Sequence, residues 1–325
     1  MAKNKIYPFA VASVRSMENK LLTKQKLMQM AEAKSAEEAL RLLADTEYGK
    51  TPVRDPHAFE QMIQNHLTEA YQAVAKLIPN ETFMDIFRFK NDYHNLKVLI
   101  KEEISGNSGR SFMVQGGTIP AEEMRKQFRE RNYRELPNID EKAVEEAIAM
   151  YAKTKNGRYV DTILDKACFQ TMSTAAEKLG IAYVSQYVKK LADMTNLKTL
   201  LRIRSMDRTE QEFSESLVPG GEISTETLMR AFRSDSAVAV LKETAYGTLC
   251  EGYMEQGFTV FEKACDDYLM AYIKEAKYKT LTPEPVAAYI LAKETEAKCV
   301  RIIMTCKLHD IDTEIIQERV REAYV

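Results

Sequence analysis

An all-α fold is predicted by three features of this 325-residue sequence. Apolar residues recur at intervals of three and four along most of the chain. One such face consists of Phe59, Met62, Ile63, Leu67, Ala70 and Val74. Glycine and proline are scarce, at 12 and 9 residues, and most of them lie between the periodic segments. No stretch alternates apolar and polar residues strictly enough to predict a β-strand.

Turn-forming residues divide the chain into helical segments. Loops are predicted where glycine, proline, asparagine or serine residues cluster, at 48–56, 105–109, 116–117, 136–138, 156–157, 219–221 and 282–285. Ser35-Ala36-Glu37-Glu38 predicts a helix start, because the serine and glutamate side chains of such a capping box bond free backbone amides.

The helical pattern repeats about every 101 residues. An apolar–acidic pair opens a long helical segment three times, at Phe59-Glu60, Val160-Asp161 and Phe261-Glu262. About 33 residues after the first two pairs lie two hexapeptides, DYHNLK from Asp92 and DMTNLK from Asp193. A more divergent third copy, EAKCVR, begins at Glu296 and has Cys299 in place of the asparagine.

Two further motifs follow the hexapeptides. Gly116-Gly117 and Gly220-Gly221 are interpreted as turns before helices, with a fading echo at His309. The helical segments AEEMRKQF, TETLMRAF and TEIIQERV then begin at Ala121, Thr225 and Thr313. Self-similarity at a fixed period is the signature of repeat architectures. The sequence therefore predicts three similar helical units, at residues 1–109, 110–219 and 220–325.

In each hexapeptide the acid and the residue at the asparagine position, which is Cys299 in the third copy, are predicted one turn apart on or beside the apolar face of the helix, with the cation at its edge. The candidate polar positions are Asp92, Asn95, Lys97, Asp193, Asn196, Lys198, Glu296 and Arg301. An acid on an apolar stripe is unfavourable unless it is hydrogen-bonded, so each copy is expected to hold a neighbouring helix. Alternatively, these groups face a shared central opening and contact a partner there. The cations would then meet an acidic partner, unless they are solvated or paired with the glutamates of adjacent turns.

Composition argues against nucleic acid as the main partner. Hydrophobic residues make up 45% and charged residues 29% of the chain, with a net charge of −2 and a pI near 6.2. Neutralising phosphates needs a basic excess or stripe. The five cysteines show no CxxC spacing and lie in apolar helical patterns, which is typical of reduced cytosolic thiols.

No secretory signal is recognised at the start of the sequence. The longest apolar run, residues 286–292, is far shorter than the roughly 20 residues of a membrane-spanning helix. The chain is therefore expected to be soluble and cytoplasmic, and at most peripheral to a membrane.

The motifs give no support for catalysis or cofactor binding. The four histidines are far apart and form no zinc-binding pattern, and no P-loop is present. Asp266-Asp267 is typical of all-α enzymes that hold magnesium and a diphosphate, but the acid expected three residues later is Met270. No catalytic residue, cofactor or metal is predicted. A metal-dependent enzyme that uses the two aspartates is kept only as an alternative.

The order of these motifs resembles the C subunit of prokaryotic V-type (V/A-type) ATP synthases, whose family includes the d subunit of the vacuolar ATPase. The opening stretch from Tyr7 to Leu27 and the closing stretch from Pro283 to Val325 are similar to that family as well. No single motif is highly specific, but the resemblance spans the whole chain. Cys299 departs from the pattern, because the family motif has asparagine there.

The resemblance implies a non-catalytic coupling protein without a cofactor. Three similar helical subdomains would surround a pseudo-threefold axis and form a funnel-shaped socket for the foot of the central shaft subunits. The other side would sit on the cytoplasmic face of a membrane ring of proteolipid subunits, and the chain would transmit torque between the two. The alternative is a soluble helical-repeat scaffold that binds proteins, although units of about 105 residues exceed the 20–45 residues of solenoid repeats.

Overall fold

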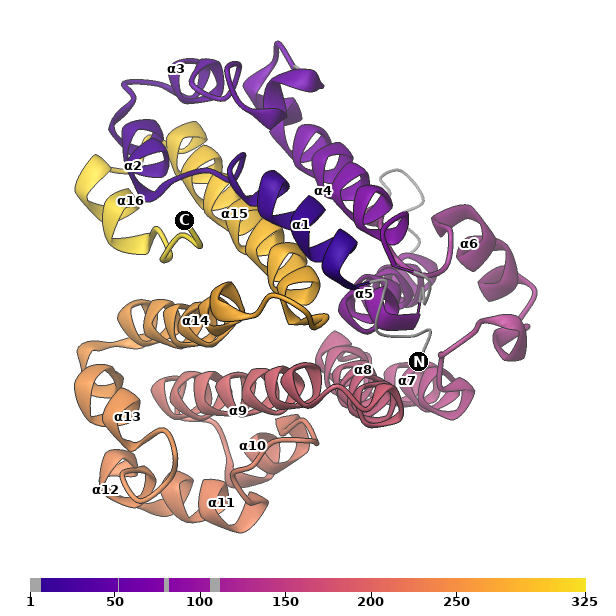
Figure 1. Cartoon of the computed structure of the whole chain (residues 1–325). Helices are drawn as coiled ribbons and strands as arrows, with labels where there is room; N and C mark the ends of the chain where they lie inside the picture. The colour runs from indigo at the N-terminus through magenta and orange to yellow at the C-terminus, as the bar shows by residue number, and fades with distance from the viewer. Residues whose placement is uncertain (1–6, 52, 79–81, 106–111) are drawn as a thin grey trace. The chain divides into compact units, whose positions relative to one another are not determined.

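The structure is a computed structural model that describes residues 7–51, 53–78, 82–105 and 112–325 (Figure 1). All regular secondary structure in these ranges is helical, which confirms the all-α prediction. None of the described helices is both long and apolar enough to cross a membrane.

Contacts divide the chain into two compact units. Residues 1–81 and 249–325 form one, here called the terminal unit, and residues 82–248 form the other, the central unit. The three-unit division, and its arrangement around a pseudo-threefold axis, stay predictions.

The terminal unit combines helices from both ends of the sequence. Its α-helices are α1 (Tyr7–Glu18), α2 (Lys24–Glu32), α3 (Ala36–Arg41), α4 (Phe59–Ala75), α14 (Phe258–Lys274), α15 (Glu284–Leu308) and α16 (Thr313–Arg319). Its short 3₁₀ helices are η2 (Glu47–Lys50), η3 (Pro56–Ala58), η5 (Met254–Gln256) and η6 (Glu275–Tyr278). Helix α13 (Gly247–Tyr253) spans the boundary with the central unit.

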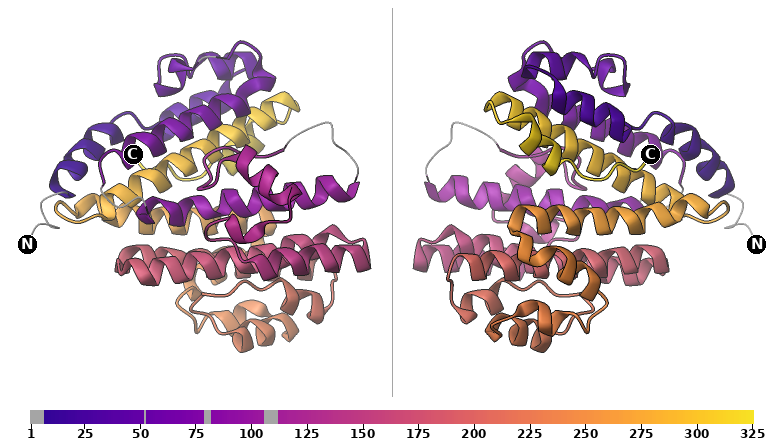
Figure 2. Two further views of the ribbon diagram at one scale, coloured as in Figure 1. Left: turned by 90° about the vertical axis from the view of Figure 1, so that its right-hand side faces the viewer. Right: turned by 90° about the vertical axis from the view of Figure 1, so that its left-hand side faces the viewer.

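Helix α15 is the core helix of the terminal unit, and α1 and α4 lie alongside it (Figures 1 and 2). Val300 and Ile303 of α15 are fully buried and pack in one cluster with Leu27 of α2 and Ile63 of α4. Residues 286–292 of α15 are buried as well. The longest apolar run of the sequence is therefore core, which explains why it is apolar without being membrane-spanning.

The central unit is a second helical assembly. Its α-helices are α5 (Thr82–Ser105), α6 (Ala121–Arg129), α7 (Glu141–Thr154), α8 (Gly157–Leu179), α9 (Ala182–Ser205), α10 (Glu210–Ser216), α11 (Thr225–Arg233) and α12 (Ala237–Leu241), with one 3₁₀ helix, η4 (Tyr133–Glu135). Helix α8 packs against α5, α7 and α9, and α9 also contacts α10 and α11. Leu164 of α8 and Leu197 of α9 are fully buried in this packing.

Helix lengths repeat across both units. Helices α5 and α9 each have 24 residues and α15 has 25. Helices α6, α11 and α2 have nine residues each, and α10 and α16 have seven each. Helix α16 follows α15 after four residues, as α10 follows α9. The sequence analysis matched the helix that begins at Thr313 with the helices that begin at Ala121 and Thr225. This match is corrected, because α16 has the length of α10 and the same position after a long helix.

All five cysteines are buried. Burial raises the pKa of Cys168 and Cys250 to about 12 and that of Cys299 to about 11. Because the thiolate is the reactive form, we expect no labelling of the native protein by a thiol-specific chromogenic reagent at neutral pH. After unfolding in guanidinium, all five should react. Fast labelling of even one cysteine in the native protein would contradict the packing described here.

Candidate functional site

The acid and the amide of each full hexapeptide are buried side by side on a long helix. Asp92 and Asn95 of α5 are 1% and 0% exposed, and Asp193 and Asn196 of α9 are 0% and 3% exposed. Their burial agrees with the prediction that they lie on or beside the apolar face of each helix. A carboxylate at this depth is strongly unfavourable without hydrogen bonds, so the bonds these groups make decide what the site does.

Each aspartate accepts hydrogen bonds from the backbone of the turn after the glycine pair. The amides of Thr118 and Ile119 donate to the two carboxylate oxygens of Asp92, at 3.0 and 3.1 Å. The amides of Glu222 and Ile223 donate in the same way to Asp193, at 2.9 and 3.1 Å. The sequence analysis predicted that each acid bonds a neighbouring helix. The acids do make buried hydrogen bonds, but the backbone donors lie in the loop that leads into α6 or α11.

The glycine pairs make this close approach possible. The first glycine of each pair has a positive φ, +84° at Gly116 and +93° at Gly220, a conformation that L side chains rarely adopt. The second lies against the aspartate. A Cβ atom at Gly117 would stand 2.2 Å from Asp92 Oδ1, and one at Gly221 would stand 2.2 Å from Asp193 Oδ1. Both glycines are therefore required by the bond itself.

Each asparagine clamps one valine of the same loop at two points. Asn95 Nδ2 donates to the carbonyl oxygen of Val114 at 2.9 Å, and Val114 N–H donates to Asn95 Oδ1 at 2.8 Å. Asn196 makes the same two bonds with Val218, both at 2.9 Å. An amide is the side chain that can both donate and accept here, which explains asparagine at this position.

Each aspartate also accepts a hydrogen bond from a hydroxyl group, but the residue that provides it differs between the two copies. Thr118 Oγ1 donates to Asp92 Oδ2, and Tyr246 Oη donates to Asp193 Oδ2, both at 2.7 Å. Burial raises the pKa of Asp92, although the bonds from Thr118 and Ile119 oppose the shift. We call the acid, the amide and their loop partners the carboxylate clamp.

In the third copy the clamp is closed by the N-terminal part of the chain. Glu296 of α15 accepts a bond from the Leu22 amide at 2.5 Å and one from Lys293 Nζ at 2.9 Å. Lys293 Nζ also lies 2.9 Å from His66 Nε2. Burial alone would raise the pKa of Glu296, but His66, Lys293 and the Leu22 amide outweigh it and lower that pKa. Leu22 precedes α2 as Ile119 precedes α6 and Ile223 precedes α11. The sequence analysis expected the third copy of this turn at His309. That expectation is wrong, because the segment that contains Leu22 takes the place of the turn.

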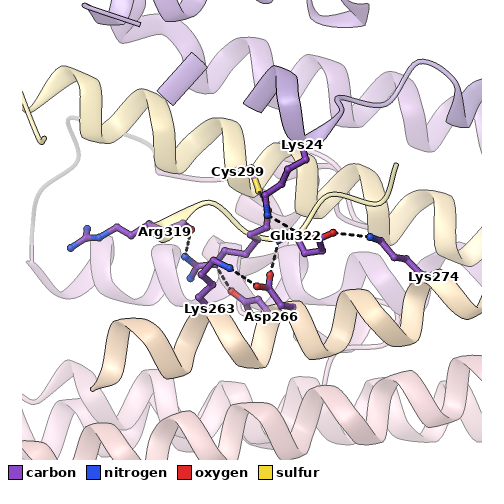
Figure 3. A network of polar contacts seen from close by, with 9 residues as sticks. Lys24, Lys263, Asp266, Lys274, Cys299, Arg319 and Glu322 are labelled. Carbon is purple, nitrogen blue, oxygen red and sulfur yellow. Dashed lines mark hydrogen bonds and ion pairs between the residues drawn. The ribbon is translucent and has the colours of Figure 1, made fainter. Parts of the chain in front are cut away.

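The C-terminal segment replaces the loop that carries Val114 and Val218. Cys299, in the asparagine position, has its Sγ 3.9 Å from the carbonyl oxygen of Arg321, a much weaker contact than the amide clamp. Ion pairs hold the segment instead. Arg321 Nε donates to Asp266 at 2.8 Å, and Glu322 lies between Lys24 and Lys274 (Figure 3).

The paired aspartates of α14 serve this attachment. Asp266 accepts from Lys298 and Arg321, and Asp267 accepts from Lys263 and from the Glu322 amide. Within the described ranges, no group of three or more histidine, cysteine, aspartate or glutamate residues is placed to hold a metal ion.

The recurring cations Lys97 and Arg301 join neighbouring helices. Lys97 of α5 pairs with Asp165 of α8 at 2.5 Å, and Arg301 of α15 makes two bonds to Glu60 of α4, at 2.8 and 2.7 Å. Lys198 is half-buried on α9. The acids that Lys97 and Arg301 contact lie on neighbouring helices, not on adjacent turns of their own helix. A role of these cations in binding a partner stays a prediction.

One repeated motif escaped the sequence analysis. Thr46-Glu47-Tyr48-Gly49 and Thr244-Ala245-Tyr246-Gly247 stand 198 residues apart in sequence. Both tyrosines are 1% exposed, and Tyr246 bonds Asp193. Tyr48 lies beside the third clamp, because its ring centroid is 4.0 Å from that of His66 and 5.9 Å from Lys293 Nζ. Burial and then the Glu296 carboxylate raise the pKa of Tyr48 well above its usual value. The spacing could have revealed the pair, since it is close to two repeat lengths.

The Gly221→Ala substitution should destabilise the protein by about 1–3 kcal/mol, because its Cβ would displace a buried carboxylate from two backbone amides. Gly252→Ala is the matched control, since a Cβ there meets nothing within 4 Å. It should be neutral or stabilising by up to about 1 kcal/mol. Urea unfolding followed by circular dichroism measures both. Equal midpoints for the two variants would refute the role of the close approach.

Arg301→Glu should lower stability by about 1 kcal/mol, because it places a second carboxylate beside Glu60 on a partly exposed surface. Adding Glu60→Arg should recover part of the loss by restoring opposite charges. A double-mutant cycle on thermal unfolding measures the coupling. Additive losses would show that the bidentate pair does not stabilise the contact between α4 and α15.

Several known proteins are similar to this chain along almost all of its length. The C subunit of the A-type ATP synthase of Methanocaldococcus jannaschii is 26% identical, covering 96% of this chain and 85% of the relative. The C subunit of the A-type ATP synthase of Thermococcus kodakarensis is 23% identical, covering 97% of this chain and 90% of the relative. The C subunit of the V-type sodium ATPase of Enterococcus hirae is 24% identical, covering 96% of this chain and 97% of the relative. The family model described as ATP synthase (C/AC39) subunit matches residues 10–319. The chain therefore belongs to the ATP synthase (C/AC39) subunit family.

Proposed function

We propose that this chain is the non-catalytic central-stalk subunit of a V/A-type ATP synthase or ATPase. It would link the shaft subunits to the membrane proteolipid ring and transmit torque between them. The observation that carries the proposal is the family match over residues 10–319, which covers nearly the whole chain. The chain would work in the cytoplasm, peripheral to the membrane face that bears the ring.

The carboxylate clamps suit a part that must carry load. A torque-transmitting subunit has to resist shear between its loops and its long helices. Asp92 and Asp193 each bind their loop through two backbone amides, and each also accepts a hydroxyl bond, from Thr118 of the loop and from Tyr246 respectively. Buried hydrogen bonds of this kind rigidify a structure, because breaking them leaves polar groups unpaired. The ion pair of Arg301 with Glu60 adds a cross-link between α15 and α4.

The burial of these acids also agrees with a non-catalytic role. Asp92, Asp193 and Glu296 are at most 6% exposed, and each accepts backbone bonds. General acid–base work needs a group that can reach a substrate. We therefore propose that ATP turnover and ion binding belong to other subunits of the complex.

Affinity purification of the tagged chain from its native membrane fraction tests the proposal. The expected result is co-purification with proteolipid and shaft subunits after mild detergent extraction. A second expectation is that the isolated chain gives no saturable heat with Mg-ATP in titration calorimetry. Recovery of only soluble proteins from the cytosol would favour the helical-repeat scaffold instead, and micromolar ATP binding would contradict the non-catalytic role.

A further inference from the structure

A short loop of the terminal unit presents apolar side chains to solvent. Residues 277–282, which comprise the end of η6 and the segment that leads toward α15, are all exposed, and we call them the lysine–tyrosine loop. Tyr278 is 88% exposed and Leu281 is 67% exposed. Tyr278 has the highest exposure of any large hydrophobic side chain in the described ranges. Exposed apolar groups of this size indicate a contact surface when their surroundings are ordered and charged.

The backbone of the loop is held in place by one arginine. Arg15 Nη2 donates to the carbonyl oxygens of Ala276 and Lys277, both at 2.8 Å, and of Lys279, at 3.0 Å. Arg15 Nη1 is fixed in turn by Glu18 on the next turn of α1. Tyr278 therefore projects from an anchored segment, and little conformational entropy would be lost when it binds.

The same loop carries uncompensated positive charge. Within the described part of the chain, Lys277 and Lys279 make no ion pair, and Lys277 lies over the Tyr324 ring at 4.6 Å. Burial, followed by the charges of Lys274 and Arg15, lowers the pKa of Lys277, with Glu18 opposing. An anionic partner would relieve this repulsion.

We propose that the lysine–tyrosine loop binds the headgroup region of an anionic lipid bilayer. The inference deepens the proposed function, on which it rests, by naming a second contact of this protein at the membrane besides the proteolipid ring. Tyrosine prefers the bilayer interface because its ring is apolar and its hydroxyl is polar. Lysine stems lie along apolar surface while their ammonium groups reach phosphates.

The shape and charge of the loop favour a lipid surface over an acidic protein. Binding to a bilayer surface scales with buried apolar area and with attraction to anionic lipids, and Tyr278 and Leu281 supply apolar side chains in the same loop as the two lysines. Lysine offers a point charge that suits mobile headgroups, while arginine suits the fixed geometry of a protein carboxylate. The arginine that contacts the loop, Arg15, is already used on backbone carbonyls.

The absence of tryptophan from the sequence allows a direct test. Tyr278→Trp places a single reporter in the loop of the full chain, and Met206→Trp places one at a 56% exposed position of the central unit. Vesicles of phosphatidylcholine with phosphatidylglycerol should shift the emission of the first reporter to the blue and leave the second unchanged. Pure phosphatidylcholine should shift neither, and added salt should reverse the effect because it screens the lysines.

Charge removal gives a second readout. Lys277→Gln with Lys279→Gln, on the Tyr278→Trp background, should weaken vesicle binding by about five-fold per lysine. Lys153→Gln with Lys155→Gln is the matched control, because these two exposed lysines have the same spacing in the central unit. It should leave binding unchanged. Circular dichroism confirms that each variant is folded.

Three outcomes would overturn the inference: no shift at position 278, equal shifts at 278 and 206, or equal weakening by both lysine pairs. Tighter binding of the reporter to polyglutamate than to anionic vesicles would assign the loop to an acidic protein instead. The vesicles contain neither proteolipid nor shaft subunits. Failure here therefore leaves the purification result standing, and loss of co-purification by the wild-type chain strikes the proposed function alone.

Discussion

Three buried carboxylates on the long helices set the constraint on which much of this structure depends. A carboxylate on the apolar face of a helix has no solvent to bond, so the chain must bring backbone amides to it. Asp92 and Asp193 obtain them from the turn that follows a glycine pair. This requirement fixes the path of the loop, the absence of a side chain at Gly117 and Gly221, and the start of the next helix. The acids thus hold the loop backbone to the long helices.

The third clamp ties the two ends of the chain together. Glu296 lies near the C-terminus, and its backbone donor is Leu22, near the N-terminus. Helix α2 then takes the place that α6 and α11 have after the other two clamps. The bond joins residues 274 positions apart in sequence, and both lie in the terminal unit. Tyr324 adds to this closure through its hydroxyl, which donates to Glu18 at 3.0 Å.

Such closure is consistent with membership of the ATP synthase (C/AC39) subunit family and with the coupling role proposed for the chain. A part that transmits force gains from hydrogen bonds that cannot exchange with water, and from charges that join neighbouring helices. Lys97 and Arg301 have this second function, since each bonds an acid on another helix. The lysine–tyrosine loop differs, because within the described residues its lysines form no ion pair. It is the part of the terminal unit for which we propose a partner outside the chain.

The sequence by itself determined the all-α class, the burial of Asp92 and Asn95, and the turn at each glycine pair, because these follow from local periodicity and backbone preference. It also carried the family resemblance through the order of its repeats. Only the tertiary structure decided what the buried groups bond, since Leu22 and Glu296 are 274 residues apart and no local rule brings them together. The same reason explains the misassigned α16: short amphipathic helices have similar patterns, and only their position relative to the long helices distinguishes them.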